Sequence, residues 1–355
     1  MELVNIDGSM GEGGGQILRT ALALSAITGR PVRVYNIRAK RSRPGLQHQH
    51  LASVKALAEL SGARVEGAVL GSTEIVFYPG KIRGGNFTFN IGTAGSVTLL
   101  LQAIMPLMAV SEYPMSVRVI GGTDVPMSPP IDYIRFVLRP LLAKAGFDFS
   151  VSLVKRGHYP RGGGEVIVAT QGGSKLRPLE LVSSGRVLSV GGLSHCVRLP
   201  SNVAVRQARA AEEVLRTLKV PIRIEVEHYE GRPDPHLGPG SGITLWAITE
   251  RSILGGDSLG ERGKPAEQVG REAASALLRD LGTGMALDSH ASDMLLVYAA
   301  LAPGTSRLGG ASLTSHARTV IDLIKMILPK VSIRIEGGAD EGPFLAEIQG
   351  GLSAL

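Results

Sequence analysis

The chain has 355 residues, of which 44% are hydrophobic and 19% charged, which is typical of a folded globular protein and argues against general disorder. Lysine and arginine number 38 against 31 acidic residues, and the net charge of +7 favours an anionic partner such as nucleic acid or a nucleotide. The single cysteine, Cys196, excludes an intrachain disulfide framework and a cysteine-based zinc site, so we expect a cytoplasmic protein.

Glycine-rich turns lead into apolar helices twice in the first half of the chain. The first turn, 11–15, precedes a predicted helix, and so does the second, 92–96. The predicted helices and the strands and second helices that follow them cover 16–27, 32–37 and 48–61 in the first copy and 97–110, 116–120 and 131–145 in the second. The offset of roughly 80 residues indicates a repeated α+β module. The apolar stretch 98–110 contains Gln102 and Pro106 and is shorter than the roughly 18 residues of a membrane span, so we expect no membrane association.

A third copy of the module is predicted late in the chain, with helices over 293–301 and 319–328 and strands over 331–336 and 344–349. At a steady period this copy would begin near position 175, so the delay predicts an inserted domain. The insert, 185–280, has its own pattern of predicted strands (187–197, 222–228, 243–249) and helices (202–218, 265–281), with a Pro- and Gly-rich loop over 230–242. We therefore expect an α+β fold in which three repeated α/β modules form a body, 1–184 and 281–355, around a smaller α/β insert.

The loop at 11–15 has the sequence Gly-Glu-Gly-Gly-Gly. Backbone amides at a helix start can face an oxygen anion, although a tight strand–helix turn is the commoner explanation of such glycines. Glu12 would repel a phosphate unless a cation lay between them, which suggests a ligand for a divalent metal. An acid that complements the helix dipole is an equally good explanation.

A basic segment follows the first helix. Between positions 30 and 43 there are six basic residues and no acidic one: Arg30, Arg33, Arg38, Lys40, Arg41 and Arg43. A run of charge is usually a solvated face, but the Pro44-Gly45 pair and the Gln/His cluster at 47–50 indicate a shaped loop, so we expect an anion site here. His48 and His50 fall on different faces of a helix, so joint metal ligation is not expected.

Two later segments carry further candidates. The segment 156–164, Arg-Gly-His-Tyr-Pro-Arg-Gly-Gly-Gly, implies positive φ or a close backbone approach, and a hairpin connection is its simplest explanation. His316 begins the last long helix, where the helix N-terminus favours the neutral imidazole that a nitrogen nucleophile needs. His290 and Asp293 share a helix face, which is also ordinary helix-start chemistry.

Taken together, these segments resemble the RNA 3′-terminal phosphate cyclase family over nearly the whole chain. The resemblance rests on the pieces 11–19, 37–46, 49–51, 121–124 with Pro129-Pro130, and above all 156–166, in this order and with an insert at the family's position. It implies three modules similar to the C-terminal domain of a translation initiation factor plus an α/β insert. It also implies an ATP-dependent ligase that converts an RNA 3′-phosphate into a 2′,3′-cyclic phosphodiester through an enzyme–histidine–AMP intermediate and an RNA-adenylate.

The resemblance assigns roles residue by residue. The nucleophile matches His316, and the acid that binds Mg²⁺ (or Mn²⁺) matches Glu12. Positions that bind ATP and its phosphates match Arg19, Arg38, Arg41, Gln49, His50, Gln102, Pro129, His290 and Asp293. The family has tyrosine at the position of His290 and glutamine at that of Met294, so the preferred nucleotide stays open.

Two other functions compete with the cyclase. A non-catalytic relative that binds RNA in ribosome assembly would lack the nucleophilic histidine and the metal-binding acid, and both His316 and Glu12 are present. A sequence-tolerant RNA-binding protein would show salt-dependent RNA affinity and no dependence on nucleotide. The implied partners are ATP and RNA with a 3′-phosphate end, and a homodimer is possible.

Overall fold

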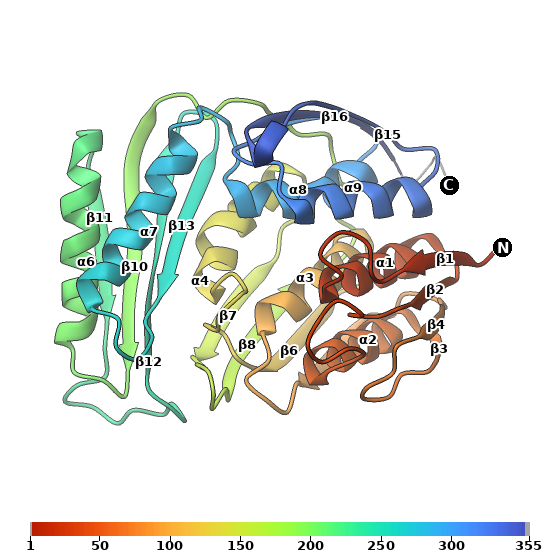
Figure 1. Ribbon diagram of the computed structural model, residues 1–355, viewed down its shortest axis with the longest axis horizontal. Helices are drawn as coiled ribbons and strands as arrows, with labels where there is room; N and C mark the ends of the chain where they lie inside the picture. Colours follow the sequence, from red (N-terminus) through yellow and green to blue (C-terminus); the bar gives the residue numbers. More distant parts are fainter. Residues whose placement is uncertain (1, 352–355) are drawn as a thin grey trace.

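The computed structural model describes residues 2–351 and shows a mixed α/β protein (Figure 1). Within these residues the strands form four four-stranded sheets. The first unit comprises β1 (Val4–Asp7), α1 (Gly15–Thr28), β2 (Val32–Tyr35), α2 (His48–Ser61), β3 (Arg64–Glu66) and β4 (Ile75–Tyr78). The second comprises β5 (Gly85–Asn90), α3 (Val97–Val110), β6 (Met115–Gly121), α4 (Ile131–Tyr133), a π-helical turn (Ile134–Leu138), α5 (Arg139–Lys144), β7 (Ser150–Lys155) and β8 (Gly164–Thr170).

A third unit begins with a strand that the sequence pattern did not reveal. It comprises β9 (Glu180–Leu181), α8 (Ser289–Leu301), β14 (Gly304–Gly310), α9 (Ser315–Ile327), β15 (Ser332–Gly337), a 3₁₀ turn (Ala339–Glu341) and β16 (Phe344–Gly350). The strand orders β1-β2-β4-β3, β5-β6-β8-β7 and β9-β14-β16-β15 match, and in each sheet the first pair is parallel and the others antiparallel. Because β9 lies at 180–181, the third unit starts close to the expected position 175, and the delay falls between β9 and α8.

The intervening chain forms the fourth sheet. It comprises β10 (Val187–Val197), α6 (Asn202–Leu215), a 3₁₀ turn (Arg216–Leu218), β11 (Ile222–Glu227), β12 (Gly240–Thr249), β13 (Ile253–Leu259) and α7 (Ala266–Leu281), with strand order β11-β10-β12-β13. Leu245, Leu254 and Leu277 belong to a separate apolar core beneath α6 and α7. The opposite face meets the other units, where Trp246 stacks on Phe136 with ring centroids 4.3 Å apart. The expected loop over 230–242 is shorter than predicted, because β12 already begins at Gly240.

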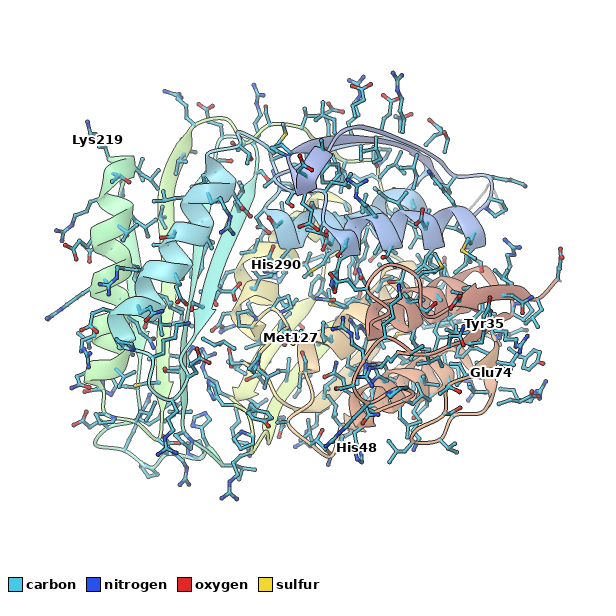
Figure 2. All side chains as sticks on the ribbon, in the orientation of Figure 1. Tyr35, His48, Glu74, Met127, Lys219 and His290 are labelled. Carbon is cyan, nitrogen blue, oxygen red and sulfur yellow. The ribbon has the colours of Figure 1, made fainter. Side chains whose placement is uncertain are left out.

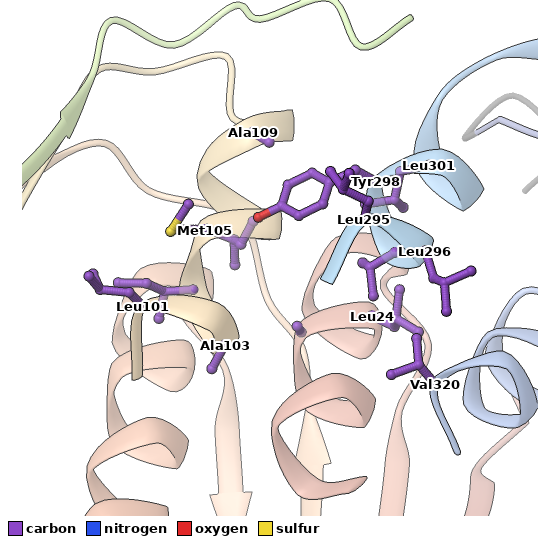
Figure 3. Close-up of a cluster of buried hydrophobic side chains, with 14 of the residues drawn as sticks. Leu24, Leu101, Ala103, Met105, Ala109, Leu295, Leu296, Tyr298, Leu301 and Val320 are labelled. Atoms are coloured by element: carbon purple, nitrogen blue, oxygen red, sulfur yellow. The ribbon is translucent and has the colours of Figure 1, made fainter. Parts of the chain in front are cut away.

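The helices of the three similar units pack against one another in one large core. Figure 3 shows Leu24 of α1, Met105 of α3, Leu296 and Tyr298 of α8 and Val320 of α9 within this core. Burial of such aliphatic side chains supplies about 25 cal/mol for each Å² removed from water, which compensates for the scarcity of aromatic residues. No helix within residues 2–351 is long and apolar enough to cross a membrane.

Local signals decide where the site helices begin. The Thr314 side chain accepts a hydrogen bond from the Ala317 backbone N–H and caps α9, so the helix begins at Ser315, four residues before the predicted start at Thr319. Asp288 caps α8 in the same way. By contrast, Gly14 precedes α1 without any side-chain cap, which leaves backbone N–H groups of the first turn unsatisfied by a side chain.

Candidate functional site

A cleft of about 770 Å³ lies where α1, α3, α8 and α9 converge. In Figure 2 the labelled His290 and Met127 lie near the middle of the molecule, between the fourth sheet and the N-terminal unit. The cleft is lined by all eleven residues that the resemblance singled out: Glu12, Arg19, Arg38, Arg41, Gln49, His50, Gln102, Pro129, His290, Asp293 and His316. The structure therefore brings together side chains that are spread over 300 positions of sequence. Their position in one cleft does not by itself assign a role to each of them.

The glycine loop is shaped by its close approach to other residues. Gly11 and Gly13 have φ of 49° and 60°, in the left-handed region that favours glycine. A Cβ on Gly15 would lie 2.3 Å from Nε2 of His50, so any larger residue there would displace that ring. The loop thus places the uncapped start of α1 directly beside the imidazole, in an arrangement suited to a bound anion.

Arg19 is a buried cation without an anionic partner. It lies one turn into α1 with 8% of its surface exposed, and no carboxylate within residues 2–351 forms an ion pair with it. Burial lowers its pKa to about 10, so the guanidinium stays charged at neutral pH. Since an unpaired buried charge is costly, Arg19 marks a place where a ligand anion would be stabilised.

His50 is a neutral donor beside Arg19. Burial, together with the charges of Arg19 and Arg38, lowers its pKa to about 3. Its Nδ1 accepts a hydrogen bond of 3.2 Å from the backbone N–H of Gln47, so Nε2 carries the ring proton. That N–H faces the Gly15 region and can donate to a phosphate oxygen without adding charge.

The basic loop contributes two arginines of different kinds. Arg38 adopts a φ of 56°, and its Nη1 donates to the carbonyl oxygens of Arg43 and Gly45, which hold the side chain in place. Arg41 reaches the glycine loop, where its Nη2 lies 3.3 Å from Oε2 of Glu12. The loop is therefore shaped by internal contacts, as expected from its Pro-Gly pair.

Glu12 and His316 meet at the edge of the cleft. Oε2 of Glu12 lies 3.3 Å from Nε2 of His316, and Oε1 accepts a hydrogen bond from the Ser315 hydroxyl. The Ser315 hydrogen bond, with smaller contributions from His316 and Arg41, lowers the pKa of Glu12, so this carboxylate is ionised at neutral pH. Both side chains are about half exposed, at 48% and 47%, and are accessible to a ligand.

The remaining predicted residues line the walls of the cleft. Oε1 of Gln49 accepts a 2.7 Å hydrogen bond from the Ser96 backbone N–H, which leaves its amide group as a donor. Gln102 Nε2 lies 3.8 Å from the Met294 sulfur, and the Pro129 carbonyl accepts a 2.7 Å hydrogen bond from Thr98. Burial raises the pKa of Asp293 to about 7, although its hydrogen bond from Thr314 opposes this shift.

Sequence reasoning missed two residues of the cleft. Asp257 of β13 lines it beside His290, and burial raises its pKa to about 6. A lone acid in an apolar strand was the signal that could have identified it. Met127, two residues before Pro129, also lines the cleft and is 90% exposed. Its φ of 61° is uncommon for a residue other than glycine.

The segment 156–164 does not reach this cleft. Arg156 is fully buried, and its guanidinium contacts Asp132 and Glu227 at 2.7 and 2.8 Å and Asp124 at 3.3 Å. These carboxylates raise its pKa well above the ordinary value despite its burial. Next to it, burial lowers the pKa of both His158 and His195. Because Glu227 and His195 belong to the fourth sheet, the segment joins that sheet to the second unit. It therefore does more than connect two strands of a hairpin.

The chain is similar in sequence to known proteins over most of its length. The family described as RNA 3′-terminal phosphate cyclase matches residues 10–335 of the chain. The RNA 3′-terminal phosphate cyclase of Hyperthermus butylicus is 61% identical over 352 residues, which is 98% of each chain. That of Ignicoccus hospitalis is 55% identical over 349 residues, covering 98% of this chain and 99% of the other. Among solved structures, the enolpyruvyl transferase NikO from Streptomyces tendae is similar over 100% of this chain and 50% of that chain with 13% identity, but its TM-score of 0.37 carries no functional conclusion.

Proposed function

The chain belongs to the RNA 3′-terminal phosphate cyclase family, and on that premise we propose that it converts an RNA 3′-terminal phosphate into a 2′,3′-cyclic phosphodiester at the expense of ATP. The observation that carries the proposal is the meeting of His316, Glu12 and the unpaired Arg19 in one cleft. A protein that only bound RNA could use the arginine for a phosphate, but it would not need an accessible histidine beside an acid at the same place.

The proposed reaction has three balanced steps. Nε2 of His316 attacks the α-phosphorus of ATP, a phosphoramidate bond forms, and pyrophosphate leaves. An oxygen of the RNA 3′-phosphate then attacks the same phosphorus and displaces the histidine, giving an RNA-adenylate. Finally the adjacent 2′-OH, whose proton passes to solvent, attacks the 3′-phosphorus, which closes the ring and releases AMP.

The chain's own residues orient the triphosphate. Arg19, Arg38 and Arg41 supply three guanidinium groups, and the Nε2 proton of His50 adds a neutral hydrogen bond. We assign the base to Pro129 and His290, and the sugar to the polar groups of Gln49, Gln102 and Asp293, all of which line the cleft. This arrangement would present the α-phosphate to His316.

Glu12 fits a divalent cation. Its carboxylate is ionised, half exposed and adjacent to the expected phosphates, and Mg²⁺ is commonly held by one carboxylate together with substrate phosphates. Mg²⁺ or Mn²⁺ bound there would offset the charge of the triphosphate as the pyrophosphate leaves.

We also infer that the three units with matching strand order are copies of one module, and that the segment 185–280 is a domain inserted into the third. The matching orders and the separate core beneath α6 and α7 support this division. The insert contributes Asp257 to the cleft, so it would take part in the site while folding around its own core.

The test is incubation with Mg²⁺ and ATP labelled at the α-phosphate, followed by a denaturing gel, for the wild type and His316→Ala. A label on the wild type that acid removes and alkali does not, and that is absent from the variant, would support a histidine–AMP bond. No label on the folded wild-type protein, with active nucleotide present in excess, would overturn the mechanism and favour RNA binding without chemistry. A label on both proteins would place the nucleophile elsewhere.

A further inference from the structure

A second cluster of possible ligands lies away from the cleft, at the junction between the fourth sheet and the second unit. One possible ligand atom from each of Asp124, His158 and His195 lies within 4.8 Å of the other two, and all three side chains are buried. The two imidazole nitrogens are 3.0 Å apart, and Nε2 of His195 lies 4.0 Å from Oδ1 of Asp124. From these positions we propose that Asp124, His158 and His195 form a binding site for a transition-metal ion, with Zn²⁺ as the expected occupant.

The geometry suits tetrahedral zinc. Two imidazole nitrogens bound to one zinc ion at about 2.1 Å each lie roughly 3.4 Å apart, so the observed pair needs only a small opening. Oδ2 of Asp124 is engaged by the Thr123 hydroxyl at 2.6 Å, whereas Oδ1 has only a long contact of 3.5 Å from Arg156 and keeps lone pairs for a ligand. Three protein ligands leave a fourth position for water.

The alternative to a metal is a hydrogen bond between the two rings, and both arrangements leave Nδ1 of each ring without a partner among the described residues. In the hydrogen bond, one Nε2 would have to donate to the other. Nε2 of the nearby His236 is also buried without a partner, while its Nδ1 contacts Asp234 at 2.7 Å. His236 thus has a carboxylate on one ring nitrogen and no partner on the other, as in many metal-binding histidines, but it is not one of the three proposed ligands.

The charges around the cluster also favour a cation. Three buried or partly buried carboxylates, those of Asp124, Asp132 and Glu227, surround the single buried guanidinium of Arg156. Arg135 pairs with Asp132 from a partly exposed position, so three carboxyl groups face two guanidinium groups and carboxyl groups are in excess. A divalent cation would offset this excess, and imidazole ligands favour Zn²⁺, Co²⁺ or Ni²⁺ over Mg²⁺, which prefers oxygen.

The space for the rings is kept by glycines. A Cβ on Gly240 would lie 2.0 Å from Cγ of His158, and one on Gly242 would lie 3.1 Å from Cε1 of His195. Since Asp124 and His158 come from the second unit and His195 from β10, the ion would fasten the fourth sheet to the rest of the protein. This inference does not depend on the reaction proposed for the cleft.

The experiment measures metal binding to the full chain. Chelator-stripped wild type is dialysed against micromolar Co²⁺, and bound cobalt is counted by elemental analysis and by its visible absorption. Two variants, His195→Gln and Asp124→Asn, remove ligands. His316→Gln removes the histidine beside Glu12, which is the other place where an ion could bind. His48→Gln removes an exposed histidine elsewhere (Figure 2).

We expect one Co²⁺ with intense tetrahedral absorption in the wild type, His316→Gln and His48→Gln, and at least a tenfold weaker affinity in the two ligand variants. A thermal midpoint raised by Zn²⁺ should follow the same pattern, because a ligand of the folded state stabilises it. Absence of bound Co²⁺ in the wild type, or unchanged binding in folded His195→Gln, would overturn the proposal.

Should the ligand variants fail to fold, X-ray absorption of the Zn²⁺-loaded wild type decides the question. Two imidazole ligands with one or two oxygens support the site. A single imidazole among oxygens would place the ion at His316 and Glu12 instead and would overturn the proposal.

Discussion

Nε2 of His316 lies 3.3 Å from Oε2 of Glu12, although 304 positions separate the two residues in sequence. The first turn of α9 and the glycine loop before α1 hold this pair, and the Ser315 hydroxyl fixes the other carboxylate oxygen. In the free protein the carboxylate of Glu12 therefore lies in front of Nε2, the ring atom that would act as the nucleophile. A ligand that binds the Glu12 carboxylate would free Nε2 of His316.

Replacing His316 with alanine should abolish turnover with little effect on folding. We expect cyclisation to fall by roughly 10³-fold or more, as when other enzymes lose a nucleophile. The side chain is about half exposed, so the free energy of unfolding should change by less than about 0.5 kcal/mol. Rate assays and urea unfolding measure the two effects, and His48→Ala is the matched control. A large loss of stability would mean that His316 is a structural residue.

Glu12→Gln should keep the hydrogen bond from Ser315 and remove the charge. We expect turnover to fall by about 100-fold, and the Mg²⁺ concentration for half-maximal rate to rise, because a neutral amide is a poor ligand for a hard cation. The rate as a function of Mg²⁺ measures both effects. An unchanged metal dependence would show that the cation is held elsewhere.

Arg19→Met should separate stability from function. Because the guanidinium is buried without an anionic partner, its replacement by an apolar side chain should raise the free energy of unfolding by on the order of 1 kcal/mol. The same change should weaken ATP binding by at least about tenfold, since a charge-assisted hydrogen bond is lost. Calorimetry with ATP and urea unfolding test the pair of outcomes. Destabilisation with unchanged ATP affinity would contradict an anion site.

Asp293 should give the stability a pH dependence. Its pKa is about 7 in the folded protein and 3.8 in the reference state, so the folded state holds the extra proton between these values. The stabilising contribution of the protonated form is therefore fully present below about pH 4 and is lost as the pH rises to about 7. Urea unfolding at several pH values should show this slope, and Asp293→Asn should flatten it. Asp322→Asn, at an exposed position of the neighbouring helix α9, should leave the slope unchanged.

Asp257→Ala should alter nucleotide affinity from within the insert. The residue lines the cleft beside His290, at the end where the base is expected, so the KM for ATP should rise by about tenfold with a smaller change in kcat. Steady-state kinetics with ATP and GTP measure the effect. Glu225→Ala, on the exposed strand β11, is the control. An identical response of both variants would exclude a specific role for Asp257.

Much of the fold was predictable because its signals are local. The predicted helices over 48–61 and 97–110 and the strand over 187–197 agree with α2, α3 and β10 to the residue. The two-residue strand β9 was not predictable, since so short a segment has no periodicity of its own and is defined by its pairing with β14. The start of α9 was missed because the Thr314 cap lies outside the apolar repeat.

The site divides in the same way. The kinds of residue available, the glycine loop, the basic segment and the eleven positions of the resemblance could all be read from the sequence. Three features depended on how the chain folds: among the described residues Arg19 has no acidic partner, Glu12 meets His316, and Asp257 of the insert enters the cleft. The physical reason is that burial, pairing and pKa depend on side chains from distant segments, and their distances are set when the units pack around a common core.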